Sequence, residues 1–182
     1  MLVPVMVAQT LQEQASRERC IALLSSYKTN PESAVETPFP EDLSKVKLEF
    51  FATGCHGTCA AFTMTLTRGK VEFDGHNFVK AKGKRQAKLS DQEFDSFVRG
   101  WYEGKFTAMR EDYCTAACPD GTVIIVNDLP GSGIIFNSPK INHEVYSCFG
   151  WRDSGPITPK PPGAFFDFFE RAMSLAKSKG WL

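Results

Sequence analysis

Apolar and polar residues alternate along three stretches of the chain, over residues 46–50, 62–66 and 71–73. This period of two predicts half-buried strands of an antiparallel sheet. The last two stretches are separated by Arg68-Gly69-Lys70, which is typical of a tight turn and predicts a β-hairpin across Gly69. A further, basic strand is expected over residues 79–89.

Capping boxes mark the starts of two helices. Thr10 with Glu13 predicts a helix that docks through its C-terminal half, and Ser90 with Glu93 predicts one that runs to about residue 103. A last helix is predicted from Pro162. Its apolar stripe consists of Phe165, Phe169, Ala172, Met173 and Ala176. Phe166 lies off that stripe, where it either packs on the preceding proline-rich loop or is exposed.

Two further apolar runs, over residues 122–126 and 133–136, are interpreted as a second hairpin, and residues 141–148 as an edge strand. The expected fold class is α+β, an antiparallel sheet of five or six strands with helices packed mainly on one face. Residues 1–45 are expected to form an N-terminal arm, a helix and a proline-rich linker. Residues 46–182 are expected to form a single domain.

Charge and hydropathy exclude some partners. Lys+Arg and Asp+Glu each number 21, so no global field attracts nucleic acid or anionic lipid. No apolar run approaches the roughly 20 residues that span a bilayer. The run Met1-Leu-Val-Pro-Val-Met-Val-Ala8 resembles the back half of a signal peptide whose cationic start is missing. The alternative is a buried N-terminal strand or arm.

The six cysteines are the most informative residues of the chain, and four of them form two Cys-x-x-x-Cys pairs. They are Cys20, Cys55, Cys59, Cys114, Cys118 and Cys148. In an oxidising compartment this pattern indicates disulfides, and in the cytosol metal ligands or packed thiols. Together with the N-terminal run, it favours export to a bacterial periplasm or beyond. If both short pairs close locally, Cys20 and Cys148 are left to bond each other, whereas a Cys55–Cys118 bond would join the two loops.

The alternative is a metal- or thiol-dependent site. Its ligands would be Cys55, His56, Cys59, Cys114 and Cys118, although zinc knuckles favour two residues between their cysteines and not three. No catalytic residue is predicted. His56, His76 and His143 are all expected at the surface, without the base and orienting group that a nucleophile needs. No phosphate-loop, nucleophile-elbow or zinc-helix motif occurs. We therefore expect no cofactor and no enzymatic activity.

One basic concentration stands out. Its members are Lys80, Lys82, Lys84, Arg85 and Lys88. They suit a solvated sheet edge that discourages aggregation, or a docking surface for an acidic partner. No base-stacking aromatic residue is interleaved with them, so nucleic acid is not an expected ligand.

The segments 54–66 and 69–75, followed by the capped helix after Ser90, carry a resemblance. They resemble an uncharacterised family of bacterial envelope and lipoprotein domains, whose members show a Cys-x-Gly-x-Cys loop and a Gly-x-Val-x-aromatic-x-Gly hairpin. The likeness covers about residues 46–130 and implies no activity. The expected function is an exported, non-enzymatic binding or inhibitor module of the immunity or envelope-associated type. Its disulfide-fixed loops would form a recognition edge for another protein.

Overall fold

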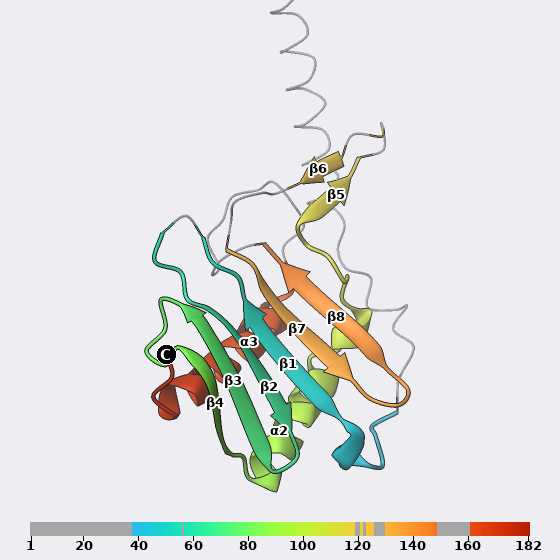
Figure 1. Ribbon diagram of the computed structural model, residues 1–182. Coiled ribbons are helices and arrows are strands. Elements are labelled where there is room, and N and C mark those ends of the chain that lie inside the picture. The colour runs from blue at the N-terminus through green and yellow to red at the C-terminus, as the bar shows by residue number, and fades with distance from the viewer. Residues whose placement is uncertain (1–37, 56, 119–120, 122, 126–129, 149–160) are drawn as a thin grey trace, which may run out of the picture.

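The computed structural model describes residues 38–55, 57–118, 121, 123–125, 130–148 and 161–182. Six strands form one antiparallel sheet in the order β4-β3-β2-β1-β7-β8, and two more form a small separate sheet (Figure 1). The main-sheet strands are β1 (Lys47–Ala52), β2 (Ala61–Thr67), β3 (Lys70–Asn77), β4 (Gly83–Lys88), β7 (Ser132–Asn137) and β8 (Asn142–Ser147). The predicted α+β class with helices on one face is confirmed. The predicted N-terminal helix lies outside the described residues.

The alternation of apolar and polar residues builds the sheet as the sequence predicts. In the pairing of β1 with β2, Leu48 lies opposite Leu66 and Phe50 opposite Met64, and all four side chains are buried. The hairpin between β2 and β3 turns at Gly69, whose φ of 81° lies in the left-handed region that glycine adopts without strain. The intervening side chains of these strands point to the other face of the sheet.

Two helices, α2 (Asp91–Glu103) and α3 (Gly163–Ser178), cover one face of the sheet (Figure 1). The capping box at the start of α2 is confirmed, since the Ser90 hydroxyl accepts from the Glu93 amide and the Glu93 carboxylate accepts from the Ser90 amide. Gly100 lets the helices approach closely, because an added Cβ would lie 2.9 Å from Cε2 of Phe168. Arg171 of α3 lies over Phe97 of α2, 4.3 Å from the ring centroid.

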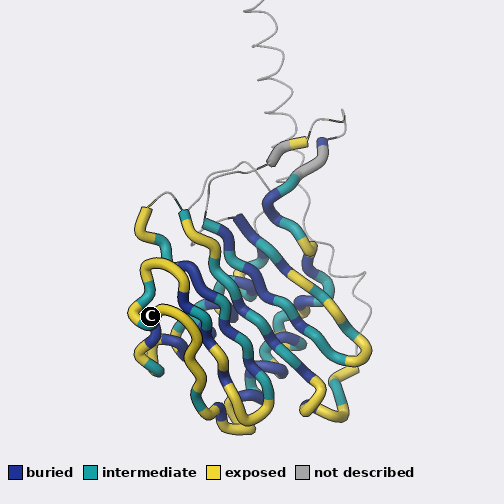
Figure 2. Tube along the Cα trace, in the orientation of Figure 1, coloured by how far each residue is buried: buried dark blue, intermediate teal, exposed yellow. Residues whose placement is uncertain are grey.

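The core between sheet and helices is aromatic. The ring of Phe50, on β1, lies 5.9 Å from Phe97 of α2 and 5.4 Å from Phe168 of α3. Trp101 stacks on Phe136 of β7 at 5.0 Å. Each such ring removes a large apolar area from water, so these contacts hold the sheet to both helices. In Figure 2, buried residues alternate with half-buried or exposed ones along the central strands.

The prediction of a second hairpin from residues 122–126 and 133–136 is wrong. The first run contains β6 (Val123–Ile125), which pairs with β5 (Thr115–Ala117) in the small sheet. The second run lies in β7, between β1 and β8 of the main sheet. There Ile134 lies opposite Phe50, and both side chains are buried. This burial of apolar area stabilises the pairing of β7 with β1, and a hairpin between the two runs would not provide it.

The basic strand is shorter than the predicted 79–89. The strand begins at Gly83. The residues before it do not pair with β3, because the Ala81 amide donates instead to the Trp181 carbonyl near the C-terminus, at 3.1 Å. The proline-rich segment expected up to residue 45 ends in a 3-10 turn, Leu43–Lys45, whose Leu43 is buried. None of the described helices has the length and apolar character needed to cross a membrane.

Candidate functional site

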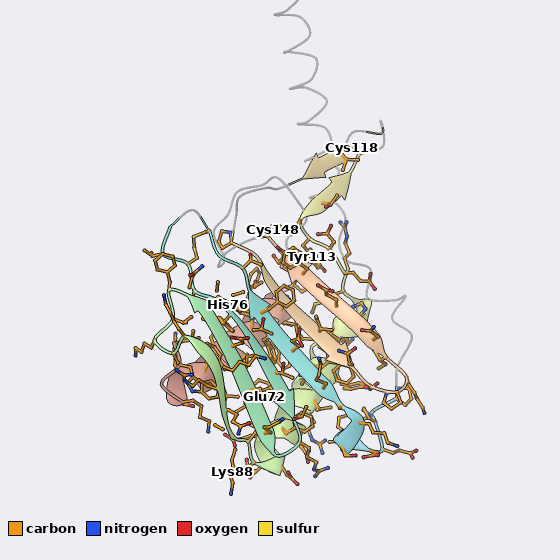
Figure 3. All side chains as sticks on the ribbon, in the orientation of Figure 1. Glu72, His76, Lys88, Tyr113, Cys118 and Cys148 are labelled. Atoms are coloured by element: carbon orange, nitrogen blue, oxygen red, sulfur yellow. A yellow bond between two sulfur atoms is a disulfide. The ribbon has the colours of Figure 1, made fainter. Side chains whose placement is uncertain are left out.

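The described cysteines gather around one end of the main sheet, which we call the cysteine end. Antiparallel pairing brings the end of β1, the start of β2, the start of β7 and the end of β8 together there. Cys55 and Cys59 lie in the loop between β1 and β2, and Cys148 directly follows β8. Figure 3 shows Cys118 and Cys148 beyond the same end.

Two disulfides are defined, Cys55–Cys59 and Cys114–Cys148. Neither a local Cys114–Cys118 bond nor a Cys20–Cys148 bond therefore forms, and Cys55 does not reach Cys118. Backbone pairing explains the choice: the Tyr113 amide donates to the Tyr146 carbonyl, and the Tyr146 amide donates to the Glu111 carbonyl, both at 2.9 Å. This short pairing on the edge of β8 brings Cys114 beside Cys148. Cys20 lies outside the described residues.

The disulfides bear on the alternative of a metal or thiol site. Cys55, Cys59 and Cys114 are oxidised, and Cys118 is also disulfide-bonded. A disulfide sulfur has no thiolate to offer a metal or a substrate. Within the described ranges, no three His, Cys, Asp or Glu side chains are grouped as metal ligands. His56 lies outside those ranges.

A pocket of about 310 Å³ opens at the cysteine end, between the strand ends and helix α3. Its described lining is mainly apolar and contains no ionisable side chain. The lining residues are Ala52, Thr53, Thr58, Cys59, Ala60, Pro130, Gly131, Ser132, Phe166, Phe169 and Met173. The volume lies at the lower end of the range of about 300–1,000 Å³ typical of small-molecule sites. The sequence did not decide whether Phe166 packs on the proline-rich loop or is exposed. It is half-buried and lines this pocket.

Hydrogen bonds and a covalent bond hold the rim of this pocket. The Thr53 amide donates to the Gly131 carbonyl at 2.8 Å, and the Gly131 amide donates to the Thr53 hydroxyl at 2.7 Å. The Cys55–Cys59 bond also closes the loop that supplies Thr58 and Cys59 to the lining. A rim fixed in this way loses little conformational freedom when something binds.

Groups with shifted pKa values lie away from the pocket. Burial raises the pKa of the Tyr113 phenol, whose oxygen accepts from the Arg110 amide at 3.2 Å. Burial also raises the pKa of Tyr102 and lowers that of Arg171. Perturbed groups often mark catalytic clefts, but none of these lines this cavity.

The histidines differ from expectation in one case. His76 is exposed, as predicted. His143 instead faces the helices, with only 14% of its side chain exposed and its ring 5.9 Å from Trp101. Its Nδ1 lies 3.7 Å from a Glu111 carboxylate oxygen. The signal in the sequence was the apolar Val145, because residues two positions apart on a strand lie on the same face, and Val145 is buried.

The predicted basic docking residues do not form one strand face. Lys80 and Lys82 are exposed in the connection before β4, whereas Lys84 and Arg85 are neighbours on β4 and so point to opposite faces. Lys88 ends the strand, as Figure 3 shows. These cations surround an exposed sheet edge.

Comparison with known proteins identifies a family whose function is unknown. Residues 46–150 match the family described as a domain of unknown function, DUF6438. The match spans the whole six-stranded sheet and α2, and it ends before α3. No curated protein matches the chain.

Proposed function

This chain belongs to the DUF6438 family, whose description assigns no activity, and we propose from its geometry that it is an exported, non-enzymatic binding or inhibitor module. The pocket at the cysteine end would receive an apolar side chain of a partner protein. The observation that carries the proposal is the closure of loop 55–59 by a disulfide where that loop forms the wall of an apolar pocket.

The lining supports binding without catalysis. Thr53, Thr58 and Ser132 provide the side-chain hydroxyls, and no base or acid accompanies them in the described lining. A hydroxyl nucleophile needs such a base within hydrogen-bond reach. Phe169 and Met173 supply the apolar floor, and the flexible thioether of a methionine adapts to differently shaped side chains.

The disulfides support export. Disulfides persist in oxidising compartments and are rare in the cytosol of mesophiles, where thiols are kept reduced. Acid-quenched alkylation of the protein in its natural producer tests this directly, and fewer than two alkylated cysteines per molecule are expected before reduction. Alkylation of all six would refute export.

The pocket is tested with the smallest mimics of a partner side chain. N-acetyl-leucinamide and N-acetyl-phenylalaninamide should shift the ¹³C-methyl NMR resonance of Met173 in a saturable manner, and N-acetyl-glycinamide should not. Thr58→Trp, a change at an exposed residue of the rim, should abolish the shift. Lys140→Trp, an exposed residue in the β7–β8 turn, is the matched control. A shift that persists in Thr58→Trp would place the ligand elsewhere and contradict the proposal.

A further inference from the structure

The second face of the six-stranded sheet carries no described helix. Helices α2 and α3 lie behind the sheet in Figure 1, and the opposite face points toward the viewer. We call it the open face. It bears the side chains that alternate with the buried ones, such as Phe51 beside Phe50 and Thr63 beside Met64.

The strand registers align one transverse row across the open face. Phe51 lies opposite Thr63 on one side and Gly133 on the other. Gly133 lies opposite Tyr146, and Thr63 lies opposite Asp74. Asp74 in turn lies opposite Lys84 of β4. Because neighbouring strands are spaced by about 4.8 Å, the row extends over about 24 Å.

Two aromatic rings with nearly parallel planes lie at one end of this row, and we call the pair the Phe51–Tyr146 platform. Phe51 and Tyr146 have ring centroids 5.8 Å apart and an angle of 19° between their planes. A Cβ added at Gly133 would overlap the Phe51 ring, and one added at Gly131 would overlap the Tyr146 ring and hydroxyl. The rings therefore lie against the backbone of the β7 region where no side chain intervenes. Both residues are half-buried, so part of each ring stays open to solvent.

A polar hollow of about 670 Å³ lies at the other end of the row. Its lining residues are Thr63, Thr65, Glu72, Phe73, Asp74, Lys84, Arg85 and Gln86. Figure 3 places Glu72 on β3 within this half of the sheet. In the part of the chain that the structure describes, no hydrogen bond or ion pair engages the side chain of Thr63, Asp74 or Gln86. Their hydroxyl, carboxylate and amide groups are thus available to a ligand.

Charge on the open face is balanced. Carboxylates of Glu49 and Glu72 are each paired with a lysine, at 3.0 Å in both cases. Asp74 lies across from Lys84. A phosphate backbone would require an excess of cations, which these pairings do not leave. The face therefore suits a ligand without net charge.

We propose that the open face binds a chain of neutral pyranose sugars. A pyranose ring has a face of C–H groups that stacks on the electron-rich face of an aromatic ring, as the Phe51–Tyr146 platform would allow. Its edge is a ring of hydroxyls, each both donor and acceptor, which the unengaged groups of Thr63, Asp74 and Gln86 match. Because the row is about 24 Å long, it can contact several sugar rings at once, and we therefore propose an oligosaccharide and not a single sugar. This surface is separate from the pocket at the cysteine end and does not depend on it.

Calorimetric titration with cellohexaose, maltohexaose and hexa-N-acetylchitohexaose, all uncharged, tests the proposal. At least one of the three should bind, and Tyr146→Ala should weaken that binding about tenfold. Tyr146→Phe retains the ring and should retain most of the affinity. Asp74→Ala leaves the platform in place and should also weaken binding, so a folding defect at Tyr146 would not obscure the result. Glu103→Ala, at an exposed position of α2 behind the sheet, is the matched control.

Three results would overturn it. The first is an absence of heat with all three hexasaccharides at millimolar concentration. The second is binding that Tyr146→Ala and Asp74→Ala leave unchanged. The third is a dimer in sedimentation experiments that Tyr146→Ala dissociates, because the open face would then hold a second copy of the chain. Thr58→Trp, which blocks the cysteine-end pocket, should not affect sugar binding, so the two proposals fail independently.

Discussion

Cys114 and Cys148 form a disulfide that ties the segment before β5 to the end of β8, across 34 positions of the sequence. The bond sits where Tyr113 and Glu111 already pair with the backbone of Tyr146. It thereby fixes the base of the small β5–β6 sheet to the edge of the main sheet. The Cys55–Cys59 bond, by contrast, closes a separation of only 4 positions.

We predict that the two bonds differ in their contribution to stability. In the chain-entropy model, a bond restricts the unfolded chain more when it closes a longer loop. Cys114→Ala with Cys148→Ala should lower the free energy of unfolding by about 4 kcal/mol, and Cys55→Ala with Cys59→Ala by about 2 kcal/mol. Urea denaturation of both double variants measures the difference. An equal loss in the two variants would contradict the loop-length explanation.

Cys118 leads to a second prediction. It is disulfide-bonded, and Cys55, Cys59, Cys114 and Cys148 are already paired with one another. Cys20 is the one cysteine of the sequence that remains. We therefore expect a Cys20–Cys118 bond. Mass spectrometry of peptides digested without reduction should find the two cysteines in one linked species, and recovery of Cys20 as a free thiol would refute the assignment.

The sequence predicted those parts of the fold that local patterns specify. Alternation identified β1 to β3, and the Ser90 capping box placed the start of α2 correctly. Partners far apart in the chain were not predictable in this way, because a strand pattern does not say which other strand it meets. The pairing of β7 with β1 and the Cys114–Cys148 bond both belong to this class.

The candidate sites show the same division. The loop of Cys55 and Cys59 was singled out from its cysteine spacing. Its role as the wall of a pocket depends on α3 residues such as Phe169, more than 100 positions later. The Phe51–Tyr146 platform was not foreseen either. Its two rings come from β1 and β8, which are separated by β7. The rings approach each other because Gly131 and Gly133 place no side chain between them.

Gly75 provides a third prediction, on the packing of β3. A Cβ at this position would overlap the carbonyl oxygen of Ala81 and lie 2.8 Å from both Phe73 Cε1 and Val79 Cγ2. Since a backbone carbonyl cannot rotate away, Gly75→Ala should shift the β3–β4 connection and cost about 1–3 kcal/mol of stability. The thermal unfolding midpoint should fall accordingly.

Gly163→Ala is the control for this change. No atom lies within 4 Å of its added Cβ, and the position begins α3. Alanine has the higher helix propensity, so this variant should be as stable as the original protein or slightly more stable. Equal midpoints for Gly75→Ala and Gly163→Ala would show that the β3–β4 connection adapts to the extra methyl group.

The capping box of α2 predicts a dependence of stability on pH. The Ser90 hydroxyl and then the Ser90 backbone amide donate to the Glu93 carboxylate, at 2.7 Å and 3.0 Å, and they lower the pKa of Glu93 below its ordinary value. The ionised form is thus favoured in the folded state. Its contribution is fully present above the unfolded pKa of about 4.3 and is lost as the pH falls through the lowered pKa of the folded protein.

Glu93→Gln, which has no charge to lose, should therefore be less stable than the original protein at pH 6 and approach it as the pH falls toward 3. Urea midpoints measured between these two pH values give the difference directly. In the Ser90→Ala background the hydroxyl donor is gone, so the pH-dependent part of the effect of Glu93→Gln should shrink. A difference in urea midpoint that stays constant from pH 6 to pH 3 would contradict the prediction. It would mean that the charge of the Glu93 carboxylate is not stabilised by its hydrogen bonds to Ser90.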